Sequence, residues 1–306
     1  MPDDDINLPE HKHSVIAIEM EILRAAPWDK SPRPFVKWAG GKGQLLGNLE
    51  QYFPRSFEMY YEPFLGGGAV FFHMVGMRSR FSAILSDINE ELITTYVVIK
   101  EQVEDLINRL KGHSKDYSVN PEKYYYEVRE TEPSADIEKA ARLIFLNKTC
   151  FNGLYRVNGK GKFNVPFGRY KNPKICDEGN LRSVSSALRW SKAKLLPGDY
   201  REATKEAKKG DFVYFDPPYH PLSSTASFTS YTRYGFSIEE QENLSEWFEE
   251  LHKRGCRILL SNSNTPEILS LYDKKSFHLK VVPALRAINC KGNLRKGHTE
   301  LIIRNY

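Results

Sequence analysis

The feature that most constrains this chain of 306 residues is an apolar run that ends in two prolines. Phe212–Phe215 has the composition of a strand buried on both faces, as in a parallel sheet. The tetrapeptide Asp-Pro-Pro-Tyr follows at 216–219, where each proline has a fixed φ and no N–H group. Open α/β sheets bind ligands at the carboxyl ends of their strands. The tetrapeptide is therefore predicted to lie in a ligand site.

These four residues suit the chemistry of an exocyclic amine on a base. The lone pair of such a nitrogen is delocalised into the ring, so the amine is a poor nucleophile. A carboxylate on Asp216 and the carbonyl of Pro217 would accept its two N–H bonds and expose the lone pair. Tyr219 would supply a flat face on which the base stacks. The bare tetrapeptide is equally compatible with an ordinary turn after a strand, so other segments must decide.

A glycine turn earlier in the chain predicts a second part of the same site. The segment Tyr60–Phe72 has the pattern of a strand, a Gly-Gly-Gly turn and a helix. Glycines let the backbone approach a ligand closely, and the helix presents its positive N-terminus to it. Asp87 lies near the end of the next apolar run, Ala83–Asn89, where an acid can bond ribose hydroxyls. Its alternative role is to cap the helix that begins near Glu90.

The segment Phe35–Gly43 carries a Gly-Gly-Lys loop before an apolar helical run. It lacks the spacing of phosphate-binding loops, and no Ser or Thr follows Lys42 to hold magnesium. The loop is either a tight turn that caps a helix or a device that lets Trp38 and Lys42 reach a small charged ligand.

Basic residues are concentrated in one stretch of a chain whose net charge is +5. From Lys148 to Lys194 there are eleven Lys and Arg against two acids, so this stretch carries +9 and the remainder −4. Such asymmetry is typical of a protein that binds a polyanion, although a charge run is more often a solvated surface. The interleaved aromatic residues, which favour the polyanion, are Phe151, Tyr155, Phe163, Phe167 and Tyr170.

Strand and helix patterns alternate on both sides of this stretch and predict a parallel α/β sheet with an inserted domain. Further strands are expected near Leu195 and over Cys256–Asn262 and Thr299–Asn305, and helices over Glu90–Leu110 and Asp136–Leu146. Ser237–Glu240 has the pattern of a capping box that opens another helix. We also expect a short helix within residues 14–26, a flap at 222–234 and a basic loop at 286–298.

The composition argues against several classes of protein. The 41% hydrophobic and 27% charged content is typical of a globular chain, and residues 1–30 contain no pattern of a secretory signal or membrane span. The four cysteines form no C-x-x-C pair, which argues against structural zinc and a disulfide framework and fits a cytoplasmic location. No cysteine follows a proline, which argues against the thiolate mechanism of cytosine-C5 methyltransferases.

Taken together, four segments resemble the Dam-type (class D12, α group) DNA adenine-N6 methyltransferases, which use S-adenosyl-L-methionine. These segments are Phe35–Lys42, Tyr61–Gly68, Ser86–Asn89 and Asp216–Tyr219. The likeness covers roughly residues 33–306. Phe151–Arg156 and Phe163–Tyr170 look like the recognition region of the GATC-specific members, above all the DpnM-type modification enzymes of restriction–modification systems.

The resemblance implies a Rossmann-like methyltransferase sheet with an inserted, largely helical DNA-recognition domain. It divides the chain into an N-terminal extension (1–32), a catalytic domain that binds the cofactor (33–98 and 194–306) and an inserted target-recognition domain (99–193).

The resemblance also implies three groups of site residues, transferred by position in the motifs. The catalytic residues would be Asp216, Pro217, Pro218 and Tyr219. The residues that bind S-adenosyl-L-methionine would be Trp38, Ala39, Gly40, Lys42, Glu62, Pro63, Phe64, Gly66, Gly68, Asp87, Asp199 and Asp216. The residues that bind DNA would be Phe151, Asn152, Leu154, Arg156, Pro166, Arg169 and Tyr170. Phe151 stands where Dam itself has a tyrosine, so it either intercalates or only packs.

The implied partner is double-stranded DNA, whose target adenine is flipped out of the stack, with no metal and no membrane involved. A cognate restriction endonuclease would act on the same DNA site without binding this chain, which would be a monomer or weak dimer. Three alternatives remain open: an orphan Dam-like regulatory methyltransferase, an N-methyltransferase of RNA or protein amides on the same fold, and a catalytically inactive DNA-binding protein.

Overall fold

The computed structural model describes residues 27–77, 81–219, 236–284 and 298–306. The helix expected within residues 14–26, the flap at 222–234 and nearly all of the basic loop at 286–298 lie outside the described residues.

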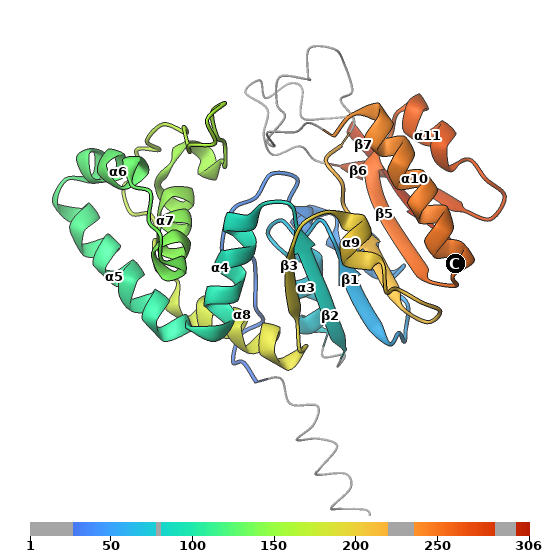
Figure 1. Cartoon of the computed structure of the whole chain (residues 1–306), viewed down its shortest axis with the longest axis horizontal. Helices are drawn as coiled ribbons and strands as arrows, with labels where there is room; N and C mark the ends of the chain where they lie inside the picture. Colours follow the sequence, from blue (N-terminus) through green and yellow to red (C-terminus); the bar gives the residue numbers. More distant parts are fainter. Residues whose placement is uncertain (1–26, 78–80, 220–235, 285–297) are drawn as a thin grey trace, which may run out of the picture.

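A seven-stranded sheet in the order β3-β2-β1-β4-β5-β7-β6 occupies the centre of the fold (Figure 1). Its strands are β1 Met59–Glu62, β2 Ser82–Asp87, β3 Lys194–Pro197, β4 Phe212–Phe215, β5 Arg257–Ser263, β6 His278–Ala284 and β7 His298–Arg304. β1 to β5 run parallel to one another, whereas β7 runs antiparallel to both β5 and β6. The carboxyl ends of β1 to β5 and the amino end of β7 therefore meet at one edge.

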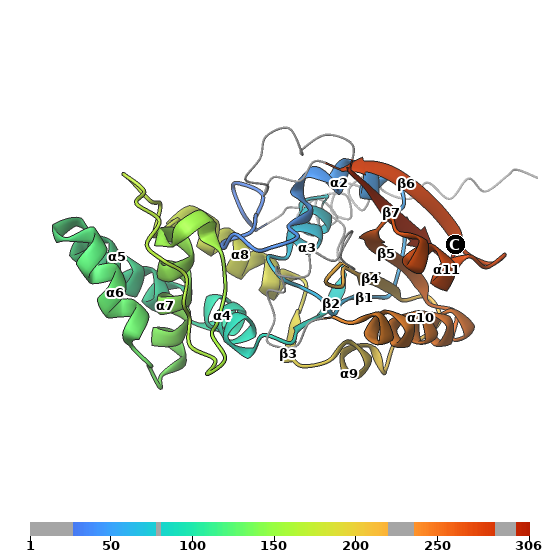
Figure 2. The same ribbon diagram turned by 90° about the horizontal axis from the view of Figure 1, so that it is seen from above.

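Successive residues of the central strands point to opposite faces of the sheet and enter two separate cores. Tyr60 of β1 belongs to a core shared with α3 Ala69–Gly76, α4 Glu90–Glu101 and α8 Glu178–Trp190. Tyr61 belongs to a core shared with α10 Ile238–Lys253 and α11 Pro266–Tyr272. Figure 2 shows α10 on one side of the strands and α3 on the other. The chain thus has the α/β architecture that the sequence predicts, with helices on both faces of the sheet.

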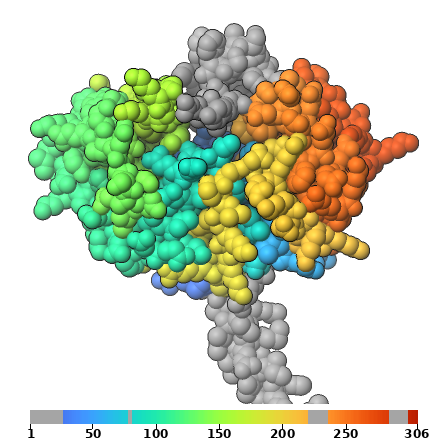
Figure 3. Space-filling view, viewed as in Figure 1, coloured from blue at the N-terminus to red at the C-terminus, as the bar shows by residue number. Residues whose placement is uncertain are grey.

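The remaining helices lie mostly beside the sheet, in the helical unit on the left of Figure 1. That unit contains α5 Val103–Val119, α6 Pro121–Glu130 and α7 Asp136–Thr149. α4 packs against both β2 and α7 and so joins the unit to the sheet. Figure 3 shows the helical unit and the α10–α11 region on opposite flanks of α4 and β3. The domain limits at 98 and 193 remain a proposal, since α8 packs against α3 as well as α5.

The short elements are η1 Lys42–Gln44, α2 Leu46–Glu50, η2 Phe151–Gly153 and α9 Tyr200–Thr204. The predicted capping box is present: the Ser237 hydroxyl accepts from the Glu240 N–H, and the Glu240 carboxylate accepts from the Ser237 N–H. The single helix predicted over Glu90–Leu110 is wrong, because Gln102 leaves the helical region (φ −133°, ψ 41°) and separates α4 from α5. Among the described residues, none of the helices combines the length and apolarity that a membrane span requires.

Candidate functional site: the carboxyl edge of the sheet

Asp216 follows the fully buried strand β4 and lies at the sheet edge, as predicted. Its carboxylate accepts a hydrogen bond from the Ser261 hydroxyl at 3.0 Å and pairs with the Lys42 ammonium at 2.7 Å. The Lys42 side chain is only 6% exposed, and its Nζ also donates to the Gly40 carbonyl at 2.7 Å. The same Nζ lies 4.6 Å from the centre of the Tyr219 ring. A nitrogen cation therefore already sits between the carboxylate and the aromatic face of the tetrapeptide.

Burial dominates the electrostatics of this site. It raises the pKa of Asp216, and the neighbouring Lys42 ammonium opposes that rise. Burial also raises the pKa of Glu62, at the end of β1, to about 8, against the stabilising hydrogen bond from Tyr60 and the nearby charge of Lys42. The hydroxyl of Tyr60 donates to Glu62 Oε2 at 2.7 Å. Near pH 7 the sheet edge thus holds Glu62 mainly in its neutral form, close to Asp216, which is paired with Lys42.

Asp87 ends β2 and is bound to the glycine turn rather than to a helix. Its two oxygens accept hydrogen bonds from the N–H groups of Gly66 and Asn89, each at 2.9 Å. The alternative capping role is wrong, because the side chain that caps α4 belongs to Asn89, which accepts from the Leu92 N–H. Burial raises the pKa of Asp87.

The glycine turn and the Gly-Gly-Lys loop touch each other. Gly66 has a φ of +48°, and a Cβ added there would lie 2.8 Å from Cδ1 of Trp38. Gly68 also has a positive φ, of +69°, and caps α3. Trp38–Gly41 form a tight turn before η1, and a role of this loop in ligand binding stays a prediction. The structure also brings Lys42 to Asp216, which the sequence left open.

The other predicted cofactor residues lie around this edge in different environments. Pro63 is buried, while Ala39 is partly exposed and Gly40 is exposed. Phe64 is partly exposed and stacks on Tyr200, with ring centres 5.6 Å apart. Asp199 follows β3, is exposed, and caps α9 by accepting from the Arg201 N–H at 2.8 Å.

The predicted DNA-binding residues gather on one surface segment, 147–170. Six of the seven are exposed, and Leu154 is partly buried; the exposed residues are Phe151, Asn152, Arg156, Pro166, Arg169 and Tyr170. The Phe151 N–H donates to the Pro166 carbonyl at 2.8 Å and so joins the two predicted recognition stretches. Asn152 and Arg169 have positive φ values of 57° and 55°, which is uncommon outside glycine.

Within this segment, residues 156–164 form a hairpin that holds Arg156. Val157 and Phe163 form an antiparallel bridge, and the Asn158 N–H donates to the Lys162 carbonyl. The Arg156 guanidinium donates to the side-chain and main-chain oxygens of Asn164, at 2.7 and 3.1 Å. Its position is thereby fixed before any ligand is bound.

Two residues of segment 147–170, Tyr155 and Asn147, join this segment to the sheet edge. Tyr155 stacks on Trp38 with ring centres 5.1 Å apart, and its hydroxyl donates to Glu91 at 3.0 Å. Asn147 is buried and accepts from the Lys37 N–H at 2.8 Å, while its amide donates to the Lys37 and Gly153 carbonyls. The two halves of the predicted site are therefore neighbours.

Comparison with known proteins identifies the family of this chain. Residues 38–288 match the family of D12 class N6 adenine-specific DNA methyltransferases. The chain belongs to this family. It is an adenine-specific DNA methyltransferase.

Relatives of this methyltransferase match it over nearly their whole length. The type II methyltransferase M.MjaIII of Methanocaldococcus jannaschii is 46% identical over 290 residues, 90% of this chain and 99% of the relative. The type II methyltransferase M1.LlaDCHI of Lactococcus lactis subsp. cremoris is 43% identical over 280 residues, 90% and 95%. The DNA adenine methylase of Escherichia coli K12 is 35% identical over 275 residues, 89% and 95%.

Several polar residues of the methyltransferase site lie outside the motifs found in the sequence. Ser261 and Asn262, at the end of β5, are buried, and so is Asn147 in α7. A Ser-Asn-Ser run at the end of an apolar strand was a signal that could have identified the first two, because buried polar groups need partners.

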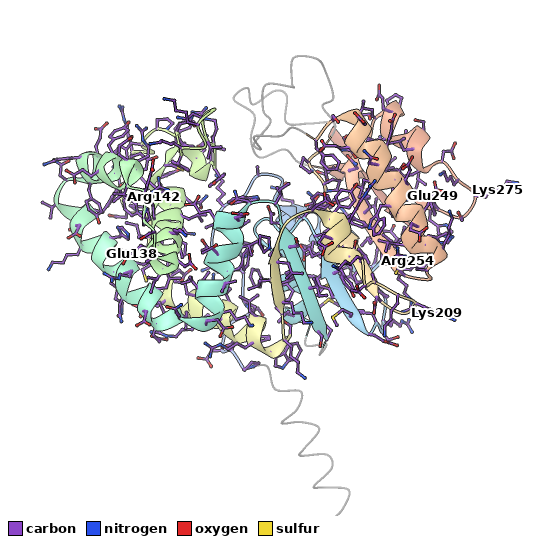
Figure 4. The ribbon with its side chains drawn as sticks, in the orientation of Figure 1. Glu138, Arg142, Lys209, Glu249, Arg254 and Lys275 are labelled. Carbon is purple, nitrogen blue, oxygen red and sulfur yellow. The ribbon has the colours of Figure 1, made fainter. Side chains whose placement is uncertain are left out.

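The excess of cations in the basic stretch is partly used within the fold. Lys162 pairs with Glu132 and Arg182 with Glu104, and both acids lie outside the stretch, whereas Lys174 pairs with Asp177, which the count of +9 already includes. Arg142 of α7, labelled in Figure 4, lies outside this stretch and pairs with Glu91 at 3.4 Å. The charge count of +9 therefore overstates the charge that remains for DNA.

Proposed function

We propose that this methyltransferase transfers a methyl group from S-adenosyl-L-methionine to N6 of adenine in double-stranded DNA at GATC. The observation that carries the catalytic part is the arrangement of Asp216 and Tyr219 around the Lys42 ammonium. A nitrogen 2.7 Å from the carboxylate and above the aromatic ring stands where the amine of a stacked base would have to stand. When the base enters, the Lys42 side chain gives up this position.

Asp216 and Pro217 would then hold the target amine, as the motif suggests. The burial-raised pKa of Asp216 makes its carboxylate a strong hydrogen-bond acceptor. Accepting both N–H bonds draws the nitrogen toward tetrahedral geometry and exposes its lone pair. Tyr219 holds the ring, since base–aromatic stacking contributes about 1–3 kcal/mol. Placing the amine in this geometry lowers the barrier mainly through orientation.

The residues at the edge fit the proposed methyl donor. Phe64 offers a partly exposed aromatic face, and Asp87 offers a partly buried carboxylate beside the glycine turn. Trp38 fills the space next to Gly66 and so forms one wall of the turn. When bound, S-adenosyl-L-methionine supplies a methyl group that is already activated by its sulfonium centre.

Arg156 and the exposed residues of segment 147–170 would read the DNA. A guanidinium fixed by Asn164 is prepared for bidentate contact with a guanine edge. Exposed Phe151 and Tyr170, 50% and 41% accessible, would stack on bases or fill the gap left by the flipped adenine. Phosphate contacts from the exposed cations of the segment would make binding fall steeply with salt.

The similarity to two type II methyltransferases supports a role as the modification enzyme of a restriction–modification system. In that role the enzyme protects host DNA in the cytoplasm, and a separate nuclease cleaves the same unmethylated site. The orphan regulatory role is the second candidate, supported by the 35% identity to the Escherichia coli DNA adenine methylase.

The decisive experiment is methyl transfer from labelled S-adenosyl-L-methionine to two duplexes that differ only in GATC against GTAC. Incorporation into the GATC duplex alone, recovered as N6-methyladenine, is the expected result. Incorporation into both would refute the GATC assignment and leave the catalytic assignment intact. Asp216→Ala should abolish transfer and keep DNA affinity, and transfer at the wild-type rate would refute the role of Asp216.

A further inference from the structure

Tyr219 is held at both of its ends by residues that lie outside the sequence motifs. Its hydroxyl donates to Glu300 Oε2 at 2.8 Å. The carbonyl of Pro218, which belongs to the peptide that enters Tyr219, accepts from the Gln241 amide at 3.0 Å. One contact fixes the far end of the ring, and the other fixes the backbone from which the ring projects.

Gln241 is an unusual residue for its place in the fold. It is 0% exposed and lies on the face of α10 that also buries Leu244 and Phe248. Burying an amide in an apolar layer is costly unless its donors and acceptors are used. Both are used here: its Nε2 reaches Pro218, and its Oε1 accepts from Asn262 Nδ2 at 2.9 Å. Asn262 is itself 0% exposed and accepts from the Ser263 N–H at 2.8 Å.

Glu300 reaches Tyr219 only because β7 is antiparallel. The residue lies near the start of β7 and pairs in register with Ser263, the last residue of β5. A parallel strand would have placed its first residues at the opposite edge of the sheet. The carboxylate is partly buried, and the tyrosine hydroxyl gives it a charge-assisted hydrogen bond, stronger than one between neutral groups.

We propose that Glu300 and Gln241 are positioning residues that clamp Tyr219 as a rigid platform for the target adenine. The proposal rests on the proposed function, since it names residues that orient the same aromatic ring. The clamp fixes the plane of the Tyr219 ring before the base binds. The amine of a base stacked on that ring is then placed directly beside the Asp216 carboxylate. Without it the ring tilts, and a misplacement of about 1 Å can slow a reaction about 100-fold.

The first test is a double-mutant cycle between Glu300 and Tyr219, read by single-turnover methyl transfer to a GATC duplex. Glu300→Ala and Tyr219→Phe each remove the same hydrogen bond, so each should lower the rate by about 10- to 100-fold. The double variant should be no slower than the slower single variant. Losses that multiply would mean that Glu300 does not act through the Tyr219 hydroxyl, and this outcome would overturn the proposal.

Two further variants separate positioning from general damage. Glu300→Gln keeps an acceptor for the hydroxyl, so it should recover most of the rate lost in Glu300→Ala. Glu239→Gln makes the same chemical change at an exposed residue in the first turn of α10 and should keep the wild-type rate. The affinity for S-adenosyl-L-methionine should stay within about twofold in every Glu300 variant. A rate unchanged by Glu300→Ala would refute the clamp.

The hydrogen bond from Gln241 to Pro218 is tested by a separate variant with a matched control. Gln241→Leu removes the donor to Pro218 at nearly constant volume and should lower the single-turnover rate by about 10-fold or more. Ser245→Ala removes another buried polar group one turn along the same face, where the hydroxyl bonds only the Glu242 carbonyl among the described contacts, and should leave the rate unchanged. Equal losses in the two variants would refute the role of Gln241.

Stacking is read independently of transfer by 2-aminopurine placed at the target adenine. Wild-type protein should quench this fluorophore once the flipped base stacks on Tyr219, and Glu300→Ala should quench it less. If the wild type transfers no methyl group to adenine at all, the proposed function fails. If the wild type transfers normally and Glu300→Ala quenches and transfers as the wild type does, only the clamp fails.

Discussion

Glu62 should make the stability of this methyltransferase fall as the pH rises. Its side chain is 2% exposed at the end of β1, and burial is the largest cause that raises its pKa from 4.5 to about 8. A carboxyl whose pKa is higher in the folded than in the unfolded chain stabilises the fold in its neutral form. That stabilisation is fully present below pH 4.5 and is lost as the pH rises through 8.

The size of this loss of stability follows from the difference between the folded and unfolded pKa values of Glu62. Each pH unit between the two pKa values corresponds to roughly 1.4 kcal/mol, so the full loss is about 5 kcal/mol. Between pH 5 and pH 9 the expected loss is about 4 kcal/mol, because a small part falls outside that window. Glu62→Gln keeps an oxygen that accepts from the Tyr60 hydroxyl but does not titrate, so it lacks this loss.

The assay is urea unfolding at pH 5, 7 and 9, followed by tryptophan fluorescence, with the free energy of unfolding extrapolated to water. The difference in the free energy of unfolding, Glu62→Gln minus wild type, should rise by about 4 kcal/mol from pH 5 to pH 9. Glu246→Gln makes the same change on the exposed face of α10 and should run parallel to wild type. If the free energy of unfolding changes with pH in the same way for Glu62→Gln and wild type, the raised pKa of Glu62 is refuted.

Three further substitutions test other contacts. Lys42→Met leaves the Asp216 carboxylate buried without its cation and should lower the free energy of unfolding by about 3–5 kcal/mol, measured in urea at pH 8; a loss below 1 kcal/mol would contradict the pairing. Gly66→Ala forces a side chain into a left-handed backbone and against Trp38, so it should cost about 1–2 kcal/mol and weaken the binding of S-adenosyl-L-methionine, measured by calorimetry. Asn147→Leu leaves the Lys37 N–H and the Lys37 and Gly153 carbonyls without this partner, at about 1–3 kcal/mol for each group left unpaired, measured in urea. Unchanged unfolding in Asn147→Leu would mean that other groups satisfy these atoms.

The strand patterns of the sequence were sufficient to predict the parallel half of the sheet. The apolar run Phe212–Phe215 forms a strand that is buried on both faces, and the segment that contains Tyr60 forms a strand, as expected, because hydrophobic patterning is a local property of the chain. Asp87 and Asp216 lie at the edge that a parallel sheet assigns to residues after its strands. The capping box at Ser237 was equally local, since its partners are three residues apart.

Only the tertiary structure decided which distant residues complete the site. Lys42 and Asp216 are 174 positions apart in the chain, and Tyr219 and Glu300 are 81 apart, so no local pattern pairs them. The antiparallel course of β7 carries Glu300 to the same edge as Asp216, and nothing in the composition of 298–304 fixes that direction. Local sequence determines which residues can stand at an edge, whereas the packing of two cores determines which of them meet.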